Sequence, residues 1–312
     1  QRRHQKVIEL APSPWLSDAS RDQITAAAVR MAAAVDYLSL GTFEFLVDHR
    51  NDADFAFIEA NPRLQVEHTV TEEVRGVDLV KAQLRIAAGA SLGDVELEQE
   101  NVPAARGYAI QCRVNMERME PDGEVRPAGG MLTVFEPPSG PGVRVDTYGY
   151  PGYSTNPNFD SLLAKVVTSS ASADFADTLR RARRALDEFQ VTGVETNLGF
   201  LSHVLDHSDF AGGSVYTRWV EDNVADLVTP ADATPTGAEG NTSSGLAGAQ
   251  IDSKDPLAGL NYFREGSGTR DSQLTAVATA PGAQPTPEIV GPPNTTPVRS
   301  PLQGTILEVT VA

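Results

Sequence analysis

The chain has 312 residues, 40% of them hydrophobic, and a formal net charge of −17 at pH 7. That length allows two domains of ordinary size, and no apolar run approaches the roughly 20 residues that a membrane span needs, so we expect no membrane segment. The acidic balance argues against a nucleic-acid binder, because a phosphate backbone needs a basic protein face.

The two ends and the single cysteine bear on where the protein works. Residues 1–6 are basic, but no hydrophobic stretch of signal-peptide length follows them. The one cysteine, Cys112, excludes an internal disulfide and should be a buried strand residue. These features favour the cytoplasm. Because the chain opens at Gln1 and stops after an alternating strand pattern at 305–311 that needs a partner, we expect it to be cut at both ends.

The first region should combine a helix with a hairpin. Ser17 and Asp18 are candidate N-caps for a helix with an apolar face that lasts to about Tyr37. Two β-rich runs, residues 42–47 and 55–59, flank a polar, turn-like segment. Such a pair predicts an antiparallel hairpin.

After the hairpin, residues 62–66 should be irregular, and one helix should run from about 71 to 88 with Gly89 as its stop. Short strands with Gly and Pro turns are expected from 107 to 167. Two further helices are predicted over residues 171–189 and 195–206. Four arginines between 180 and 184 lie on the wet side of the first of them, which is typical of a solvated face.

From about Thr229 the composition shifts to Pro, Thr, Gly, Ser and Ala with few aromatics, which is typical of a linker. Two segments interrupt it. Residues 255–263 could form a short docking element, and residues 298–311 regain the character of a strand.

The densest polar cluster lies around the hairpin. Glu44 and Glu59 alternate with aromatic or aliphatic neighbours, so on adjacent antiparallel strands both should face away from the core. Two such carboxylates can share a hard cation, and Mg²⁺ prefers oxygen ligands while keeping positions open for phosphate. Asn61 adds a neutral oxygen.

The residues after Asn61 suggest an anion site. Alternation puts Arg63, Gln65 and Glu67 on one side. Arg63 offers a planar fork that matches a carboxylate or carbonate, Gln65 can donate to the same anion, and Glu67 is placed to take its proton. Each of these residues alone could be a solvent-facing group, and Arg63 with Glu67 could be a surface ion pair worth under ~1 kcal/mol.

Two runs around these residues resemble the nucleotide–metal segment of the biotin carboxylases, the ATP-grasp unit of acetyl-CoA, propionyl-CoA and pyruvate carboxylases. The runs are Gly41-Thr42-Phe43-Glu44-Phe45 and Phe57-Ile58-Glu59-Ala60-Asn61-Pro62-Arg63-Leu64-Gln65-Val66-Glu67-His68. Further runs resemble the family in the same order along the chain. They are residues 1–6, 76–80, 83–89, 107–115, 142–144 and 159–165.

The resemblance implies an α+β fold with four parts. These are the C-terminal part of an ATP-grasp domain over residues 1–106, the mixed α/β biotin carboxylase C-terminal domain over 107–228, a largely irregular linker over 229–296, and the start of a biotinyl (lipoyl-like) β domain over 297–312. Residues 299–307 resemble the opening strand of a biotinyl carrier domain, and the chain ends before the biotin-bearing lysine of such a domain.

The resemblance also implies roles for individual residues. Those that would hold Mg²⁺ or Mn²⁺ against the phosphates of ATP are Glu44, Glu59 and Asn61. Those that would bind bicarbonate are Lys6, Arg63, Gln65 and the Val66 backbone. Glu67 would deprotonate bicarbonate, Arg144 would stabilise deprotonated biotin, and His4 would lie near the nucleotide.

The leading hypothesis is therefore the ATP- and bicarbonate-dependent carboxylation of biotin, the first half-reaction of an acyl-CoA carboxylase. Its partners would be carboxyltransferase and biotinyl carrier domains, in the same chain or in other subunits, and a homo-oligomer is expected. The glycine-rich lid of the family would precede this sequence, so these residues alone should be inactive. The alternatives are a urea carboxylase, a pyruvate carboxylase, another ATP-grasp ligase such as a carbamoyl-phosphate synthetase, and a non-catalytic assembly module.

Overall fold

The computed structural model of the protein describes residues 1–2, 5–120, 122–155 and 159–228. All of them belong to one compact unit. The predictions for His4, for the linker at 229–296 and for the biotinyl strand at 297–312 fall outside the described residues. Within the described ranges, no helix combines the length and the apolar character that crossing a membrane requires.

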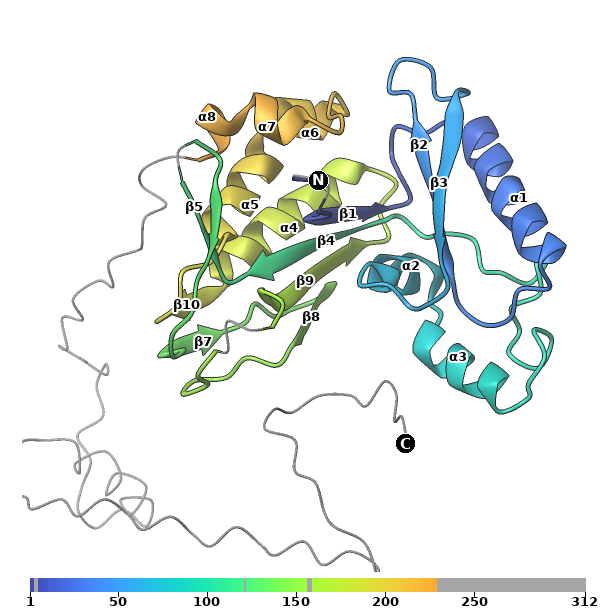
Figure 1. Ribbon diagram of the computed structural model, residues 1–312, viewed down its shortest axis with the longest axis horizontal. Helices are drawn as coiled ribbons and strands as arrows, with labels where there is room; N and C mark the ends of the chain where they lie inside the picture. The colour runs from blue at the N-terminus through green and yellow to red at the C-terminus, as the bar shows by residue number, and fades with distance from the viewer. Residues whose placement is uncertain (3–4, 121, 156–158, 229–312) are drawn as a thin grey trace, which may run out of the picture. The chain divides into compact units, whose positions relative to one another are not determined.

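A four-stranded antiparallel sheet, in the order β1-β4-β9-β8, forms the centre of this unit (Figure 1). Its strands are β1 (Ile8–Ala11), β4 (Tyr108–Asn115), β9 (Leu162–Ser170) and β8 (Val143–Thr147). β1 pairs with β4 so that Glu9 lies opposite Gln111. The domain boundary expected at residue 106 stays a prediction. However, β1, which precedes this boundary in the sequence, pairs with β4, which follows it.

The two faces of the sheet differ because side chains alternate along each strand. Ile110, Cys112 and Val114 of β4 point to one face and join the main hydrophobic core, as predicted for Cys112. Helices α4 (Phe175–Glu188) and α5 (Leu198–Asp206) supply apolar side chains to that core. Gln111 and Arg113 point to the opposite face, where Ala109 packs against helix α2.

The predicted hairpin is confirmed. Strand β2 (Thr42–Val47) pairs antiparallel with β3 (Phe55–Asn61). Helix α1 (Asp18–Ala34) precedes it, and the Ser17 hydroxyl caps the helix by accepting the Ser20 N–H at 3.2 Å. The helix ends three residues before the expected Tyr37, and Ser20 is its one fully buried residue, so the expected apolar face does not form a core.

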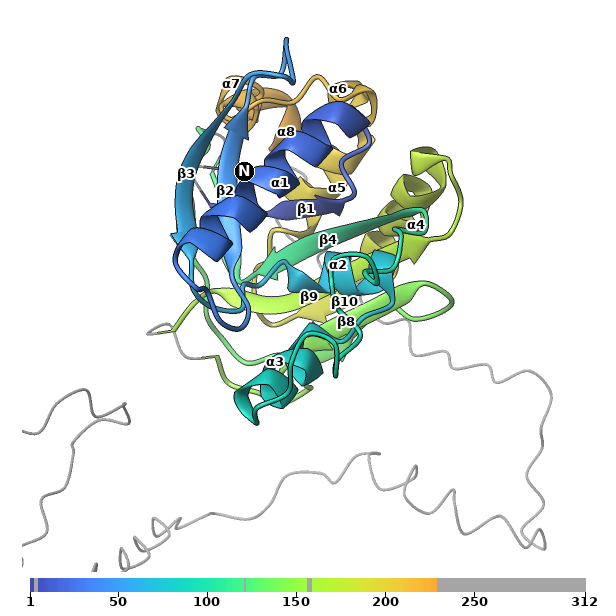
Figure 2. The same ribbon diagram turned by 90° about the vertical axis from the view of Figure 1, so that its right-hand side faces the viewer.

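The single helix predicted over 71–88 is wrong, because the structure has two helices there. Helix α2 (His68–Arg75) ends at Gly76, whose φ of 67° is left-handed and terminates the helix. Helix α3 (Leu79–Ala87) then starts from Asp78, whose side chain accepts the Lys81 N–H. Gly89 follows α3, as predicted. In Figure 1, α2 lies on the side of the sheet that faces the β2–β3 pair, and Figure 2 shows it covering the sheet.

The remaining elements are short. Two small ladders pair β5 (Glu117–Met119) with β6 (Val125–Pro127), and β7 (Val134–Glu136) with β10 (Gln190–Thr192). The last helices are α6 (Ser208–Gly212), α7 (Trp219–Asp222) and α8 (Val224–Leu227). Helices α4 and α5 each begin later than predicted because Asp174 and Asn197 occupy their N-cap positions. Arg180 and Arg184 are exposed on α4, as expected of a solvated face, whereas Arg181 and Arg183 are half-buried.

The turn into β4 depends on Gly107, whose φ is +62° and whose added Cβ would clash with the Ser170 carbonyl. Gly107→Ala should therefore destabilise the full-length protein that contains this chain by about 2 kcal/mol or more. Urea or thermal unfolding measures the change. Gly212→Ala is the matched control, since its Cβ meets nothing within 4 Å, and it should stay within about 0.5 kcal/mol. Equal stability of the two variants would contradict this account of the turn.

Candidate active site

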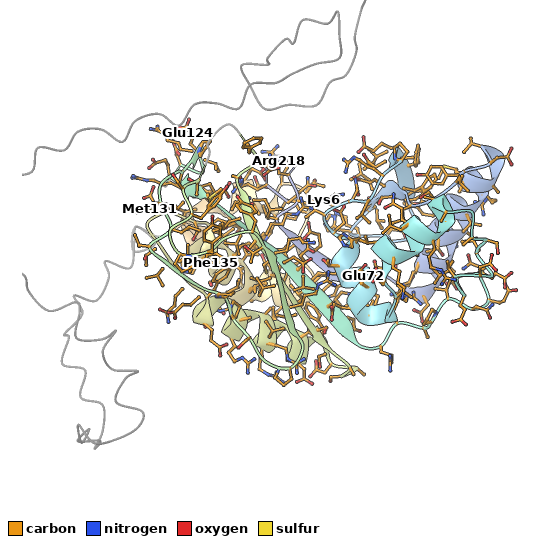
Figure 3. The ribbon with its side chains drawn as sticks, turned by 90° about the horizontal axis from the view of Figure 1, so that it is seen from below. Lys6, Glu72, Glu124, Met131, Phe135 and Arg218 are labelled. Atoms are coloured by element: carbon orange, nitrogen blue, oxygen red, sulfur yellow. The ribbon has the colours of Figure 1, made fainter. Side chains whose placement is uncertain are left out.

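Lys6 connects the N-terminal segment to the hairpin and to α2. Its ammonium group lies 2.7 Å from Glu44 Oε1 on β2 and 2.5 Å from Glu67 Oε1 at the start of α2. Burial lowers the pKa of Lys6, but the hydrogen bonds to the two carboxylates outweigh burial and raise that pKa above its ordinary value. Lys6 is therefore a cation at neutral pH. Figure 3 shows it where the sheet meets the hairpin, with Glu72 of α2 nearby.

Glu44 and Glu59 form a cross-strand pair, as predicted. They lie opposite each other in the ladder, and the register shifts only after Glu44. Asn61 Nδ2 donates to Glu44 Oε1 at 3.1 Å and to Glu59 Oε1 at 2.9 Å. The hydrogen bond from Lys6 lowers the pKa of Glu44, against the opposing effect of burial, and Gln65 and the charge of Arg63 act in the same direction as Lys6. The Glu44 carboxylate is thus ionised at neutral pH.

These three residues fit a hard divalent cation in their chemistry. Two carboxylates and one amide converge, and Mg²⁺ takes oxygen ligands of this kind. In the structure the Asn61 nitrogen faces both carboxylates, so a half-turn of the amide would present its oxygen instead. Across the described ranges there is no group of three or more His, Cys, Asp or Glu arranged for a metal. The cation would therefore depend on ligands from outside this set, such as phosphate oxygens.

The loop between β3 and α2 is irregular, as predicted. Its polar residues Arg63, Gln65 and Glu67 were expected on one side, but they do not share the same environment. Gln65 Nε2 donates to Glu44 Oε1 at 3.3 Å, and Glu67 contacts Lys6. Arg63 is exposed, and within the described part of the chain its guanidinium donates only to the Leu64 carbonyl. Its charge still acts on Glu44, so Arg63 lies at the rim of the cluster rather than within it.

Gln65 also has a buried hydrogen-bond acceptor, its Oε1 atom, without a donor among the described residues. Buried acceptors in proteins are almost always satisfied. This one lies in the same cluster as Lys6 and Glu67, which is consistent with a ligand that brings a hydroxyl or an N–H.

Sequence reasoning missed a second layer behind Glu67. Arg113 Nη2 lies 3.0 Å from Glu67 Oε2, and Arg113 Nε donates to Glu9 Oε1 at 2.5 Å. Gln111 Nε2 donates to Glu9 Oε2 at 2.7 Å and accepts from the Thr69 hydroxyl. The two-residue spacing of Gln111 and Arg113 in a β-rich run was the signal available in the sequence, because it puts both on one face.

Arg144 lies on the same face of the sheet but in a separate cluster. Its guanidinium bonds both oxygens of Asp146, at 2.9 and 3.1 Å, and Glu72 Oε2 at 2.9 Å. Lys165 joins this cluster to the loop, since its amine lies 3.0 Å from Asp146 Oδ2 and 3.4 Å from the Val66 carbonyl. Arg144 therefore reaches the Lys6 cluster only through intermediate groups.

A cavity of about 560 Å³ opens beside Lys6 and Glu67. Its walls come from β1, α2 and the segment 204–220, and they include the aromatic side chains Phe210, Tyr216 and Trp219. Mostly apolar walls with a few charged groups at one end are typical of sites for small ligands.

Comparison with known proteins decides the family. Residues 1–95 match the carbamoyl-phosphate synthase L chain ATP binding domain, and residues 111–222 match the biotin carboxylase C-terminal domain. The pyruvate carboxylase of Pichia angusta is 46% identical over 223 residues, or 71% of this chain and 18% of that protein. Biotin carboxylase 1 of Bacillus subtilis (strain 168) is 43% identical over 221 residues, or 71% of this chain and 47% of that protein.

Solved structures agree. A single-chain, multi-domain long-chain acyl-CoA carboxylase is 46% identical, with a TM-score of 0.68 over 73% of this chain and 24% of its own. The biotin carboxylase domain dimer of Hydrogenobacter thermophilus 2-oxoglutarate carboxylase, in complex with MgADP, ADP and bicarbonate, is 36% identical, with a TM-score of 0.67 over 73% of this chain and 48% of its own. The chain belongs to the biotin-dependent carboxylases.

Within that family, the described residues correspond to part of the biotin carboxylase region. The chain spans about a fifth of the pyruvate carboxylase and about half of the separate biotin carboxylase. The matched domains are of ATP-grasp type and of the biotin carboxylase C-terminal type, both mixed in helix and strand. This bears out the fold class for the described residues.

The Arg144 cluster gives a pH-dependent prediction. Burial raises the pKa of Asp146, but hydrogen bonds from Arg144 and Lys165 outweigh burial and bring that pKa below its ordinary value. Ionised Asp146 therefore stabilises the folded protein above its unfolded-state pKa, and this contribution is lost as the pH falls through the folded-state value. Asp146→Asn should lower the free energy of unfolding by about 2 kcal/mol at pH 7 and by much less near pH 3.

Urea unfolding of the full-length protein at the two pH values measures this difference. Asp187→Asn is the control, because Asp187 is an exposed partner of Arg183 on α4. That variant should change stability by less than about 0.5 kcal/mol at either pH. An Asp146→Asn effect that is equal at pH 7 and pH 3 would contradict the assignment.

Proposed function

We propose that the protein containing this chain uses ATP and bicarbonate to carboxylate biotin, as the first half-reaction of an acyl-CoA carboxylase. One observation carries the proposal. The Lys6 ammonium lies within 2.7 Å of Glu44, a candidate metal ligand, and of Glu67, the candidate base. A cation that joins a divalent-metal site to a general base is suited to bringing an anion and a phosphate together.

In this proposal the metal site orients the nucleotide. Glu44, Glu59 and Asn61 would hold Mg²⁺ or Mn²⁺, and the cation would neutralise charge on the ATP phosphates. The apolar cavity beside Lys6, with Tyr216 and Trp219 in its walls, suits the adenine base. His4 would lie near the nucleotide, as the family resemblance implies.

Bicarbonate would bind between Lys6, Arg63, Gln65 and the Val66 N–H. Gln65 supports this assignment through its amide nitrogen, which donates to Glu44 Oε1 at 3.3 Å and carries a second N–H suited to an anion. Glu67 would take the proton as the O–H bond breaks, and the freed oxygen would attack the γ-phosphorus with ADP as the leaving group. The carboxyphosphate so formed would break down to CO₂ and phosphate, and the phosphate would take the ureido proton of biotin. The biotin nitrogen would then bind the CO₂, while Arg144 stabilises the negative oxygen of deprotonated biotin.

The acceptor of the carboxyl group is assigned to an acyl-CoA on two grounds. The single-chain long-chain acyl-CoA carboxylase is among the structures most similar in sequence, and residues 299–307 resemble the opening of a biotinyl carrier domain. Carboxyltransferase and carrier domains would then lie in the same chain or in partner subunits, and the protein would form a homo-oligomer. Pyruvate is the second candidate acceptor, supported by 46% identity to the Pichia angusta enzyme.

Glu67→Gln in the full-length protein tests the assignment. It keeps the size of the side chain but removes the proton acceptor, so ADP release that depends on both bicarbonate and biotin should fall at least 100-fold. Glu195→Gln, at an exposed residue beside Arg118, is the control and should retain activity.

Other outcomes would redirect the assignment. Full activity of Glu67→Gln would remove Glu67 as the base. ATP cleavage that ignores biotin would favour another ATP-grasp ligase, and a folded protein without bicarbonate-dependent cleavage would favour the assembly module.

The metal assignment has its own test. Glu59→Gln should weaken Mn²⁺ binding at least 10-fold, because one of two carboxylate ligands is lost. Electron paramagnetic resonance of free Mn²⁺ measures binding in the presence of ADP, independently of turnover. Glu195→Gln should bind Mn²⁺ like the unaltered protein. Unchanged Mn²⁺ affinity in Glu59→Gln would place the cation elsewhere.

A further inference from the structure

The two oxygens of the Glu67 carboxylate have different partners. Oε1 lies 2.5 Å from Lys6, a side chain that is 36% exposed. Oε2 lies 3.0 Å from Arg113, which is 17% exposed. The ammonium group of Lys6 is carried by a flexible side chain, whereas Arg113 presents a planar, rigid guanidinium from a central strand. One oxygen of Glu67 is therefore held from the sheet, and the other faces the ligand side of the cluster.

Arg113 is itself anchored from the neighbouring strand. Its Nε donates to Glu9 Oε1 at 2.5 Å, and Gln111 Nε2 binds the other oxygen of Glu9 at 2.7 Å. Glu9 lies opposite Gln111 in the β1–β4 ladder, and the Arg113 N–H donates to the Val7 carbonyl at 2.9 Å. The orientation of the guanidinium is thus fixed by backbone register as well as by side-chain hydrogen bonds.

Arg113 divides its single positive charge between two carboxylates. Arg113 faces two carboxylates, Glu9 behind it and Glu67 in front of it. A lone guanidinium would draw the Glu67 carboxylate into a fully compensated ion pair. Because Glu9 shares that charge, and Glu9 is only 9% exposed, Arg113 can orient Glu67 while a substantial part of its charge is already neutralised.

We propose that Arg113, held by Glu9, is the positioning residue that fixes Glu67 by its Oε2 atom and leaves Oε1 as the oxygen that accepts the proton. The inference rests on the proposed function, in which Glu67 is the base. Arg113 touches no substrate in this scheme and acts only through Glu67. A misplacement of about 1 Å at a reacting group is enough to lower a rate about 100-fold.

A double-mutant cycle in the full-length protein tests this action through Glu67. Arg113→Met should lower kcat for bicarbonate-dependent ADP release about 100-fold, with KM for ATP within about twofold of the unaltered value. In the Glu67→Gln background, the same substitution should lower the residual rate by less than about threefold. Residues that act as one unit give such non-additive effects, whereas independent structural roles add.

Two further variants distinguish a loss of positioning from a loss of folding. Arg183→Met is the matched control, since Arg183 also bridges two carboxylates, Asp206 at 2.6 Å and Asp187 at 2.9 Å, away from the site; it should retain kcat. Glu9→Gln combined with Arg113→Gln removes both charges together and leaves no unpaired buried ion, and it should lose kcat like Arg113→Met. Thermal unfolding of each variant reports the folded fraction.

The outcomes separate the inference from the proposed function. An unchanged kcat in Arg113→Met, or a full further 100-fold loss in the Glu67→Gln background, would overturn the positioning role while Glu67 remained the base. If Glu67→Gln alone kept full activity, the proposed function would fail, and the positioning role would fail with it. A large loss in Arg113→Met that disappears in the Glu67→Gln background would support both.

Discussion

The ion pairs of Lys6 hold the candidate site together. One ammonium group lies between Glu44 on the hairpin and Glu67 at the start of α2. Without a cation at this point, two carboxylates from different elements would face each other across a partly buried space, and like charges at that distance repel. The hairpin and the helix can approach only because the N-terminal segment brings Lys6 between them.

The position of Lys6 follows from the strand that comes after it. Residues 8–11 form β1, the edge strand of the central sheet, and their register on β4 is fixed by four residue pairs. Lys6 is two residues before that strand, so the ladder limits where its backbone can lie. The same register puts Glu9 beside Gln111 and within reach of Arg113. One edge strand thus orients both the cation and the group behind the candidate base.

The acidity of the chain makes this arrangement necessary. With a net charge of −17, the field of the protein repels anions. The cations Lys6, Arg113, Lys165 and Arg144 all lie on or beside the face of the sheet that is covered by α2, and each is paired with at least one carboxylate or carbonyl. Local pairing keeps these cations in place, so an anion can be recognised at close range despite the overall charge.

The sequence by itself determined the hairpin, the N-cap at Ser17 and the cross-strand pairing of Glu44 with Glu59, because alternation and capping are local rules. It also predicted Gln65 and Glu67 as site residues from their alternation, and Lys6 from the resemblance to a known family. It did not find the helix break at Gly76 or the roles of Glu9 and Arg113. Only the tertiary structure decided the contact between Glu9 and Arg113, because these residues are 104 positions apart and a strand pairing over that separation is set by the burial of the whole sheet rather than by any local pattern.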